Sequence, residues 1–255
     1  MSFVVIIPAR YHSTRLPAKA LCDIGGKSMI QRVWEQASKS AAERVVIATD
    51  DERIAFAVSQ FGGECQMTRA DHVSGTDRLQ EVASLLGLSK DKIIVNVQGD
   101  EPLIPPVVID QVAHNLQTQP QSGVATLCEP IENRQDFLDP NVVKVVPDIH
   151  QSALLFSRAP IPWPREAAPR EHNKKWLTGV AARHIGLYAY RVSTLDLFVT
   201  WPVCELEKTE SLEQLRFMYH GVKIHIQPAQ QKVPGGVDTE NDLKVVRALF
   251  QQYNA

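Results

Sequence analysis

Alternating strand and helix signals in the first half of the chain limit the possible folds most. Short apolar runs at 4–7, 44–48 and 92–97 are typical of buried strands. Helical patterns lie between them at 29–40, at 51–61 with Asp50 as the expected N-cap, and from about 76 to 87. A further helix begins at Pro105-Pro106 and runs to about 117. This alternation predicts an α/β fold with a mostly parallel, Rossmann-like sheet and helices on both faces.

The second half is richer in strand signals. Strands are expected at 124–127, 142–146, 153–157 and 185–189, and helices at 209–220 and 239–253, the last with Asp238 as N-cap. A proline- and tryptophan-rich segment spans 160–176 and is typical of an ordered lid or dimer contact, with a mobile loop as the alternative. No linker divides the chain, so we expect a single domain over 1–255.

Composition excludes several classes of protein. With 27 basic and 29 acidic residues, the chain has no overall positive field, so binding to nucleic acid is not expected. The four cysteines are scattered and suggest neither a zinc site nor a disulfide framework. No run approaches the roughly 18 apolar residues of a membrane helix, and the N-terminus lacks a signal-peptide pattern. We therefore expect a cytoplasmic protein without membrane contact.

A basic loop follows the first apolar run. It carries Arg10, Arg15, Lys19 and Lys27 against one acid, Asp23. Open α/β sheets bind ligands at the carboxyl ends of their strands, and guanidinium and ammonium groups suit polyphosphate. A solvated basic loop is the plainer alternative, but proline and alanine among the cations favour a shaped loop and hence a phosphate site.

Two aspartates are candidate metal ligands. Asp100 follows an apolar strand and Gly99, which permits close backbone approach, so it is expected on the same rim as the basic loop. A carboxylate beside polyphosphate needs a cation between them, which indicates Mg²⁺. Capping of a turn or helix is the alternative for Asp100. It is the commoner role for Asp238, which precedes the last predicted helix.

Further polar groups are candidates for ligand contacts. The segment Ser74–Arg78 begins a predicted helix, where backbone N–H groups can bind a base edge or a phosphate; a capped, solvated helix start is the commoner situation. His184 and Tyr188 share one face of a strand. Glu210 and Gln214, spaced i, i+4, share one face of the predicted helix at 209–220, with Glu213 beside them. These groups and Arg158 suit a polyhydroxylated acid, although a lone strand histidine is more often structural.

Together these segments resemble one family, the 3-deoxy-manno-octulosonate (KDO) cytidylyltransferases, also called CMP-KDO synthetases. CMP-sialic acid synthetases are a more distant match. The resemblance covers nearly the whole chain and rests on Ile7-Pro8-Ala9-Arg10, Ser13-Thr14-Arg15-Leu16-Pro17-Ala18-Lys19, Gly26-Lys27, Ser74-Gly75-Thr76-Asp77-Arg78, Val97-Gln98-Gly99-Asp100-Glu101-Pro102, Phe156-Ser157-Arg158, His184-Ile185-Gly186-Leu187-Tyr188, Glu210-Ser211-Leu212-Glu213-Gln214-Leu215-Arg216 and Gly236-Val237-Asp238-Thr239.

The resemblance implies a fold of the nucleotide-diphospho-sugar transferase type with a smaller β-rich part. Residues 1–120 would mainly bind nucleotide, and 121–235 would mainly bind sugar and form a homodimer contact. The implied reaction joins CTP and KDO to give CMP-KDO and pyrophosphate, for lipopolysaccharide synthesis. The anomeric hydroxyl attacks the α-phosphate in line, assisted by Mg²⁺.

The family's functional residues carry over onto matching positions of this chain. The catalytic set would be Arg10, Lys19, Asp100 and Asp238, with Asp100 and Asp238 holding Mg²⁺. The CTP contacts would be Pro8, Ala9, Arg10, Ser13, Arg15, Lys19, Ser74 and Arg78. The sugar contacts would be Arg15, Gln98, Arg158, His184, Tyr188, Glu213 and Gln214.

Other functions remain as alternatives. The 8-amino analogue of KDO, or another acid sugar such as a sialate, would use the same chemistry. A nicotinamide-dependent oxidoreductase is disfavoured because no Gly-x-Gly-x-x-Gly follows the first strand. A catalytically inactive nucleotide-binding module is disfavoured because it would not need Lys19, Asp100 and Asp238 together. One departure from the family is Ala18, where glycine is usual. A positive φ at this position would cost alanine roughly 1 kcal/mol.

Overall fold

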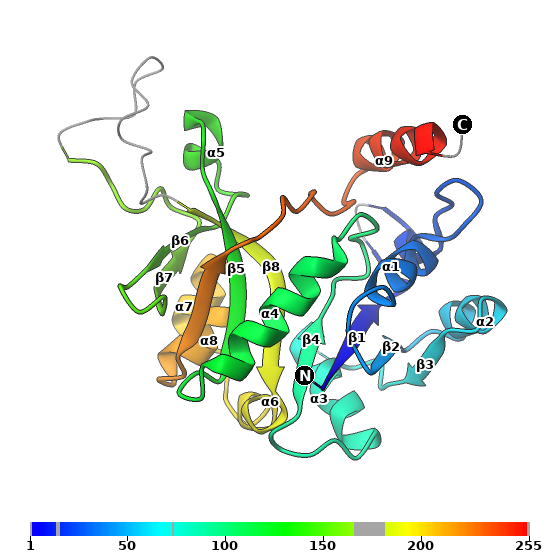
Figure 1. Ribbon diagram of the computed structural model, residues 1–255, viewed down its shortest axis with the longest axis horizontal. Coiled ribbons are helices and arrows are strands. Elements are labelled where there is room, and N and C mark those ends of the chain that lie inside the picture. Colours follow the sequence, from blue (N-terminus) through cyan, green and yellow to red (C-terminus); the bar gives the residue numbers. More distant parts are fainter. Residues whose placement is uncertain (1, 14–15, 73, 166–181, 254–255) are drawn as a thin grey trace.

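The computed structural model describes residues 2–13, 16–72, 74–165 and 182–253 (Figure 1). Its strands are β1 (Phe3–Ala9), β2 (Arg44–Thr49), β3 (Glu64–Met67), β4 (Ile93–Asn96), β5 (Val124–Pro130), β6 (Lys144–Pro147), β7 (Ala153–Ser157), β8 (Ala182–Arg191) and β9 (Ile224–Pro228). Its helices are η1 (Lys19–Leu21), α1 (Met29–Ala37), α2 (Glu52–Gln60), α3 (Gly75–Leu85), α4 (Pro106–Thr118), α5 (Arg134–Leu138), α6 (Val192–Phe198), α7 (Glu205–Glu210), α8 (Gln214–Tyr219) and α9 (Glu240–Tyr253).

The strands form one mostly parallel sheet, as the sequence predicts. Its order is β3-β2-β1-β4-β8-β5-β9, with β6 and β7 off this path. β1 pairs in parallel with both β2 and β4, whereas β8 runs antiparallel to its neighbours β4 and β5. The carboxyl ends of β1 and β4 therefore lie side by side, which brings the basic loop and the loop bearing Asp100 to one rim.

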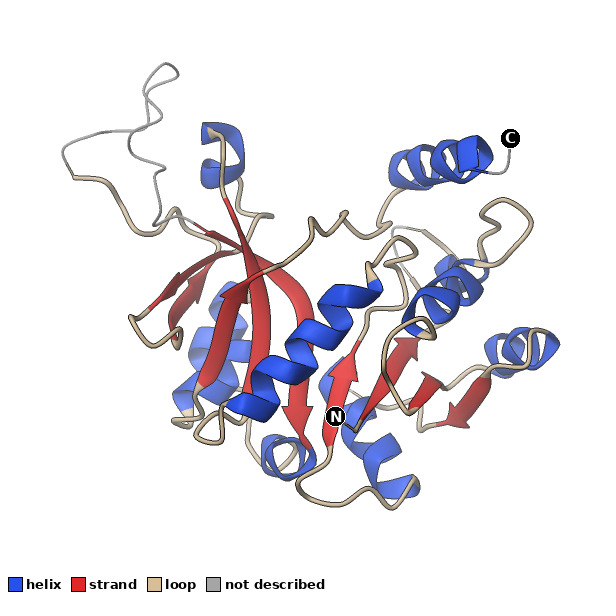
Figure 2. Cartoon of the chain, in the orientation of Figure 1, coloured by secondary structure: helices blue, strands red, loops and turns tan. Residues whose placement is uncertain are grey.

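Helices cover both faces of the sheet, which is also confirmed (Figure 2). Val5 and Ile7 of β1 pack into the cluster formed with α1, α2 and α4. Val4 and Ile6 pack into the opposite cluster, with α3, α6 and α8. Because both faces of β1 are buried, its sequence is a continuous apolar run and not an alternating one.

Several expected element boundaries are wrong. The helix predicted at 209–220 is two helices, α7 and α8, separated at Ser211, which has a left-handed φ of 52°. Glu210 and Gln214 therefore do not share an i, i+4 helix face. The N-cap of α2 is Asp51 and not Asp50. Instead, Asp50 contacts the guanidinium of Arg78 at 3.3 Å. The sequence patterns did not predict β3, α5, α6 and β9.

The last helix attaches the C-terminal part of the chain to the basic loop. Leu243 and Val246 of α9 pack with Leu16 and Ile24 of the N-terminal loops. The predicted capping role of Asp238 is wrong, because α9 begins at Glu240. Thr239 accepts a hydrogen bond from the Asp242 amide, and the Asp242 carboxylate accepts one from the Thr239 amide. This reciprocal pair does the capping, so Asp238 lies one residue before the cap.

Candidate nucleotide and metal site

A cleft of about 400 Å³ opens at the carboxyl ends of β1 and β4. It brings together most of the residues expected around a nucleotide and a metal ion. The lining includes Pro8, Ala9, Arg10, Ser13, Lys19, Gln98, Asp100 and Asp238, and the glycines Gly75 and Gly99 of the predicted motifs. His12 and Ala20 also line it and were not predicted. Four segments far apart in the chain therefore meet at one site. Arg15 lies outside the described residues.

Lys19 lies between the two candidate metal ligands. Its Nζ is 2.5 Å from Asp100 Oδ2 and 3.1 Å from Asp238 Oδ1. Burial lowers the pKa of Lys19, but the charges and hydrogen bonds of the two carboxylates outweigh burial and raise it above its ordinary value. The ammonium that lines the cleft is thus held charged. Both carboxylates therefore contact the same ammonium group.

Backbone packing fixes the position of Asp100. A side chain on Gly99 would place a Cβ 2.7 Å from the carbonyl oxygen of Pro8, so only glycine lets the β4 loop approach β1 this closely. The Asp100 carbonyl accepts a hydrogen bond of 2.8 Å from the Val237 amide. A Cβ on Gly236 would meet the Asp100 carboxylate at 3.4 Å. The loops carrying the two aspartates are therefore bonded directly to each other.

Ala18, the departure from the family pattern, does adopt a left-handed conformation, with φ 53° and ψ 32°. We expect Ala18→Gly to raise the free energy of unfolding by about 1 kcal/mol, because glycine adopts this conformation without steric cost. Thermal denaturation should show a rise in Tm of about 2–4 °C for a chain of this size. Ala20→Gly, at a position without a positive φ, is the matched control and should lower Tm. An unchanged or lower Tm for Ala18→Gly would contradict the strain assigned to Ala18.

The start of α3 forms another wall of the cleft, through Gly75. Ser74 is its N-cap and forms a reciprocal capping box with Asp77. Arg78 is fully buried, not solvated: Nη1 donates to Thr68 Oγ1 at 2.5 Å, and burial lowers the pKa of the guanidinium. Its Nε and Nη2 have no hydrogen-bond partner among the described residues. Ser74 therefore serves as a helix cap, and neither Ser74 nor the buried Arg78 is among the residues that line the cleft.

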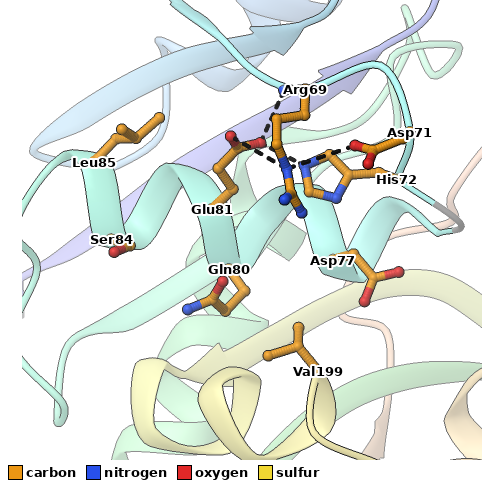
Figure 3. A pocket seen from close by; sticks show the side chains of 9 residues that line it. All are labelled: Arg69, Asp71, His72, Asp77, Gln80, Glu81, Ser84, Leu85 and Val199. Carbon is orange, nitrogen blue, oxygen red and sulfur yellow. Dashed lines mark hydrogen bonds and ion pairs between the residues drawn. The ribbon is translucent and has the colours of Figure 1, made fainter. Parts of the chain in front are cut away.

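A neighbouring cleft of about 570 Å³ lies along α3 (Figure 3). Glu81 bonds the His72 ring and accepts a 3.0 Å hydrogen bond from the Arg69 amide. The pKa of Glu81 is lowered, because these contacts outweigh the opposing effect of burial. The carbonyl of His72 in turn accepts a 3.2 Å hydrogen bond from Arg10. The charged side chains of this second cleft thus pair with one another. The loop that carries His72 is held to α3 through Glu81, and it in turn bonds Arg10.

The sugar residues expected on β8 and α8 lie together. The rings of His184 and Tyr188 are 5.2 Å apart, which confirms that they share one face of the strand. His184 keeps some exposed surface, but its ring packs between Phe156 and Tyr188, and burial lowers its pKa to about 3. Its Nε2 is 3.1 Å from Thr126 Oγ1. At neutral pH the imidazole is therefore uncharged and available for hydrogen bonding.

Buried polar atoms without partners surround the same region. The Tyr188 hydroxyl and Gln214 Nε2 lack hydrogen-bond partners among the described residues. Glu213 accepts a 2.7 Å hydrogen bond from Thr76, and burial raises its pKa. Because Thr76 follows Gly75 in α3, this bond joins the sugar set to the wall of the nucleotide cleft. Such unpaired buried groups are costly unless a ligand completes them.

Arg158, unlike the other expected sugar residues, uses its guanidinium to bond backbone carbonyls of the protein itself. Its Nε donates to the Glu210 carbonyl at 2.6 Å, and Nη1 donates to the Pro140 carbonyl at 3.0 Å. The residue therefore ties the end of β7 to the end of α7.

Glu101 lies beside Asp100 in the Gly-Asp-Glu-Pro motif, and the pKa of its buried carboxyl is raised to about 8 by burial and then by the Asp100 charge.

Comparison with known proteins gives the family. The family model described as "Cytidylyltransferase" matches residues 4–224. A protein of Cellvibrio japonicus named 3-deoxy-manno-octulosonate cytidylyltransferase is 59% identical over 98% of this chain and 99% of its own. One of the same name from Pseudomonas syringae pv. tomato is 57% identical, over 98% of both chains. The chain belongs to the 3-deoxy-manno-octulosonate cytidylyltransferase family.

One solved structure agrees with this family membership, and a second shows the fold. A CMP:2-keto-3-deoxy-manno-octonic acid synthetase complexed with CTP is 44% identical and superposes with a TM-score of 0.89, covering 99% of this chain and all of its own. A cytidylyltransferase from Leptospira borgpetersenii is 15% identical, with a TM-score of 0.64, and shows the shared fold alone. Among the described residues, no helix combines the length and apolarity needed to cross a membrane.

Proposed function

We propose that this protein transfers the cytidylyl group of CTP to KDO, giving CMP-KDO and pyrophosphate, as a step of lipopolysaccharide synthesis. The observation that carries this proposal is the cleft in which Lys19, Asp100 and Asp238 meet beside Arg10. Relatives at 57–59% identity over nearly the full chain bear the name of this activity. The comparisons do not favour the 8-amino analogue or a sialate as substrate.

The charged side chains of the cleft suit the triphosphate. In this proposal Arg10 and Lys19 bind the phosphates and stabilise the negative charge that develops on the departing pyrophosphate. The anomeric hydroxyl of the sugar forms a bond to the α-phosphorus while the bond from that phosphorus to the pyrophosphate oxygen breaks. The protein's contribution is to hold both reactants in line, since little covalent chemistry falls to the protein itself.

We further propose that Asp100 and Asp238 hold Mg²⁺. Carboxylate oxygens are the ligands this ion prefers, and it commonly takes one or two carboxylates plus phosphate oxygens and water. The residues fit, because both carboxylates already converge on one cation, the Lys19 ammonium. Among the described residues, no group of three or more acidic, histidine or cysteine side chains is placed to hold a metal ion. In this proposal phosphate oxygens complete the ligand set of the two carboxylates. When bound, Mg²⁺ would neutralise phosphate charge and lower the pKa of the attacking hydroxyl.

The sugar is proposed to lie against β8 and the start of α8. The neutral imidazole of His184, the unpaired Tyr188 hydroxyl and the Gln214 amide offer uncharged hydrogen-bonding groups to sugar hydroxyls. Gln98 lines the nucleotide cleft and would lie where nucleotide and sugar meet. The assignments of 1–120 to nucleotide binding and of 121–235 to sugar and dimer contacts remain part of this proposal.

A substrate panel tests the proposed function. Pyrophosphate release should be measured with CTP, UTP, GTP and ATP against KDO, its 8-amino analogue and a sialate, with Mg²⁺ present. CTP with KDO is expected to give the highest kcat/KM. A higher kcat/KM with another sugar would contradict the assignment of KDO as substrate. Pyrophosphate release without any acid sugar would contradict the proposed transfer reaction.

We propose a homodimer formed through the β6–β7 hairpin. Ile149 and Leu154 are 92% and 59% exposed, and β7 pairs only with β6 among the described strands. Exposed apolar side chains on an edge strand are typical of an interaction surface. Light scattering should give twice the chain mass of 28.4 kDa for the parent protein. Leu154→Glu is expected to shift this toward the monomer mass.

Phe56→Glu, on the exposed face of α2, is the matched control and should leave the dimer intact. A monomeric parent protein, or an unaffected Leu154→Glu dimer, would contradict the assigned surface.

A cytoplasmic location is also proposed. It is supported by the four free thiols, which suit a reducing compartment.

A further inference from the structure

Asp238 reaches the cleft on an irregular segment, residues 229–238, which joins β9 to α9. In Figure 1 it is the orange loop that leaves β9 and crosses toward α9. None of these residues belongs to a helix or strand. Backbone polar groups in such a segment must find partners elsewhere in the protein. Those partners decide where Asp238 lies.

The two ends of the segment are anchored by hydrogen bonds. The buried Gln111 of α4 donates from Nε2 to the Pro228 carbonyl at 2.8 Å and accepts from the Gln230 amide at 2.9 Å. At the other end, the Val237 amide bonds the Asp100 carbonyl at 2.8 Å. Between these anchors lie Pro234, Gly235 and Gly236, which are exposed. Because two of these are glycines, the end anchors alone leave this stretch conformationally free.

A third anchor holds the middle of the segment at Val233. Glu129 Oε1 accepts from the Val233 amide at 2.7 Å, and Arg183 Nη2 donates to the Val233 carbonyl at 3.0 Å. The two side chains also pair with each other, with 2.7 Å between Arg183 Nη2 and Glu129 Oε2. Glu129 and Arg183 are register partners on β5 and β8. One ion pair between neighbouring strands therefore satisfies both backbone groups of Val233, whose side chain is buried.

We propose that the Glu129–Arg183 pair is a positioning device for the Asp238 carboxylate. The pair holds Val233, the last residue before the Pro-Gly-Gly stretch. It therefore reduces the number of backbone conformations that compete with the one that places Asp238 in the cleft. Arg183 also precedes His184 on β8. The strand that is proposed to contact the sugar is thereby bonded to the segment that carries Asp238. This inference rests on the proposed function only for its kinetic consequences, because the anchoring itself is a property of the free protein.

Hydrogen exchange on the free protein tests the anchoring. Glu129→Ala removes the acceptor and the ion pair, and it is expected to speed amide exchange within 229–238 at least tenfold while β1 stays protected. Glu129→Gln keeps an oxygen acceptor and is expected to have a smaller effect. Glu64→Gln, which breaks the Arg44–Glu64 pair between β2 and β3, is the matched control and should leave 229–238 unchanged. Should Glu129→Ala fail to fold, Arg183→Lys is expected to speed exchange in the same segment.

Kinetics then test the consequence for Asp238. For Glu129→Ala, the Mg²⁺ concentration giving half-maximal rate is expected to rise about fivefold to tenfold, with kcat recovered at high Mg²⁺ and the KM for CTP within about twofold of the parent value. Unchanged exchange in 229–238, or an equal rise throughout the sheet, would overturn the inference. So would an unchanged Mg²⁺ requirement. A parent protein that releases no pyrophosphate would instead reject the proposed function and leave the exchange result standing.

Discussion

Asp100→Asn is expected to lower kcat about 10³-fold, which corresponds to about 4 kcal/mol of transition-state stabilisation. The substitution keeps the size of the side chain but removes the charge that faces Lys19 at 2.5 Å and is proposed to hold Mg²⁺. This contact should matter most while the α-phosphate is under attack. The KM for CTP is therefore expected to change less than about threefold. Steady-state rates of pyrophosphate release over a titration of Mg²⁺ measure both quantities.

Asp91→Asn is a suitable control for this experiment. Asp91 is exposed and precedes the same strand, β4, at its opposite end from Asp100. We expect its rates to equal those of the parent protein. Near-normal kcat for Asp100→Asn would remove Asp100 from the mechanism. A large rise in the KM for CTP with unchanged kcat would make it a binding residue only.

Lys19→Ala is expected to weaken both CTP binding and turnover, with a rise of about tenfold in KM for CTP and a fall of about 10²-fold in kcat. The ammonium lines the cleft in which polyphosphate is proposed to lie. Its removal also takes away the positive charge that contacts both Asp100 and Asp238, which increases the net negative charge facing phosphate. Steady-state kinetics measure KM and kcat, and calorimetric titration with CTP measures binding separately.

Lys27→Ala provides the matched control for Lys19→Ala. Lys27 belongs to the same basic loop, but its ammonium pairs with Glu35 at 2.6 Å and does not line the cleft. Its kinetics should match those of the parent protein. If Lys19→Ala binds CTP normally and turns over at the parent rate, phosphate recognition lies elsewhere in the molecule.

Much of the fold could be predicted because local patterns agree with the tertiary structure. The β1 run is continuous because both of its faces are buried, and the Ser74–Asp77 capping box marks the start of α3 in four residues. β3 escaped notice because its four residues lie at the sheet edge, partly exposed, where little apolar signal is needed. The break between α7 and α8 depends on a left-handed serine, which no periodicity reveals.

The sequence predicted which residues meet in the cleft better than it predicted the contacts that hold them there. Arg10, Lys19 and Asp100 follow strands whose parallel pairing dictates a common rim. Asp238 had an ordinary local explanation as a helix cap, and only the tertiary position of α9 shows that Thr239 takes that role. The Glu129–Arg183 pair joins residues 54 positions apart, so its relation to Val233 depends on strand order. Such contacts depend on topology, and single-sequence patterns carry little information about them.

The most direct test of the account is the location of a divalent ion in crystals grown with CTP and Mn²⁺, followed by its anomalous scattering. The account predicts one ion coordinated by a carboxylate oxygen of Asp100 and one of Asp238, together with phosphate oxygens, and Lys19 in contact with the triphosphate. An ion bound by phosphates alone, with both carboxylates still paired to Lys19, would contradict it.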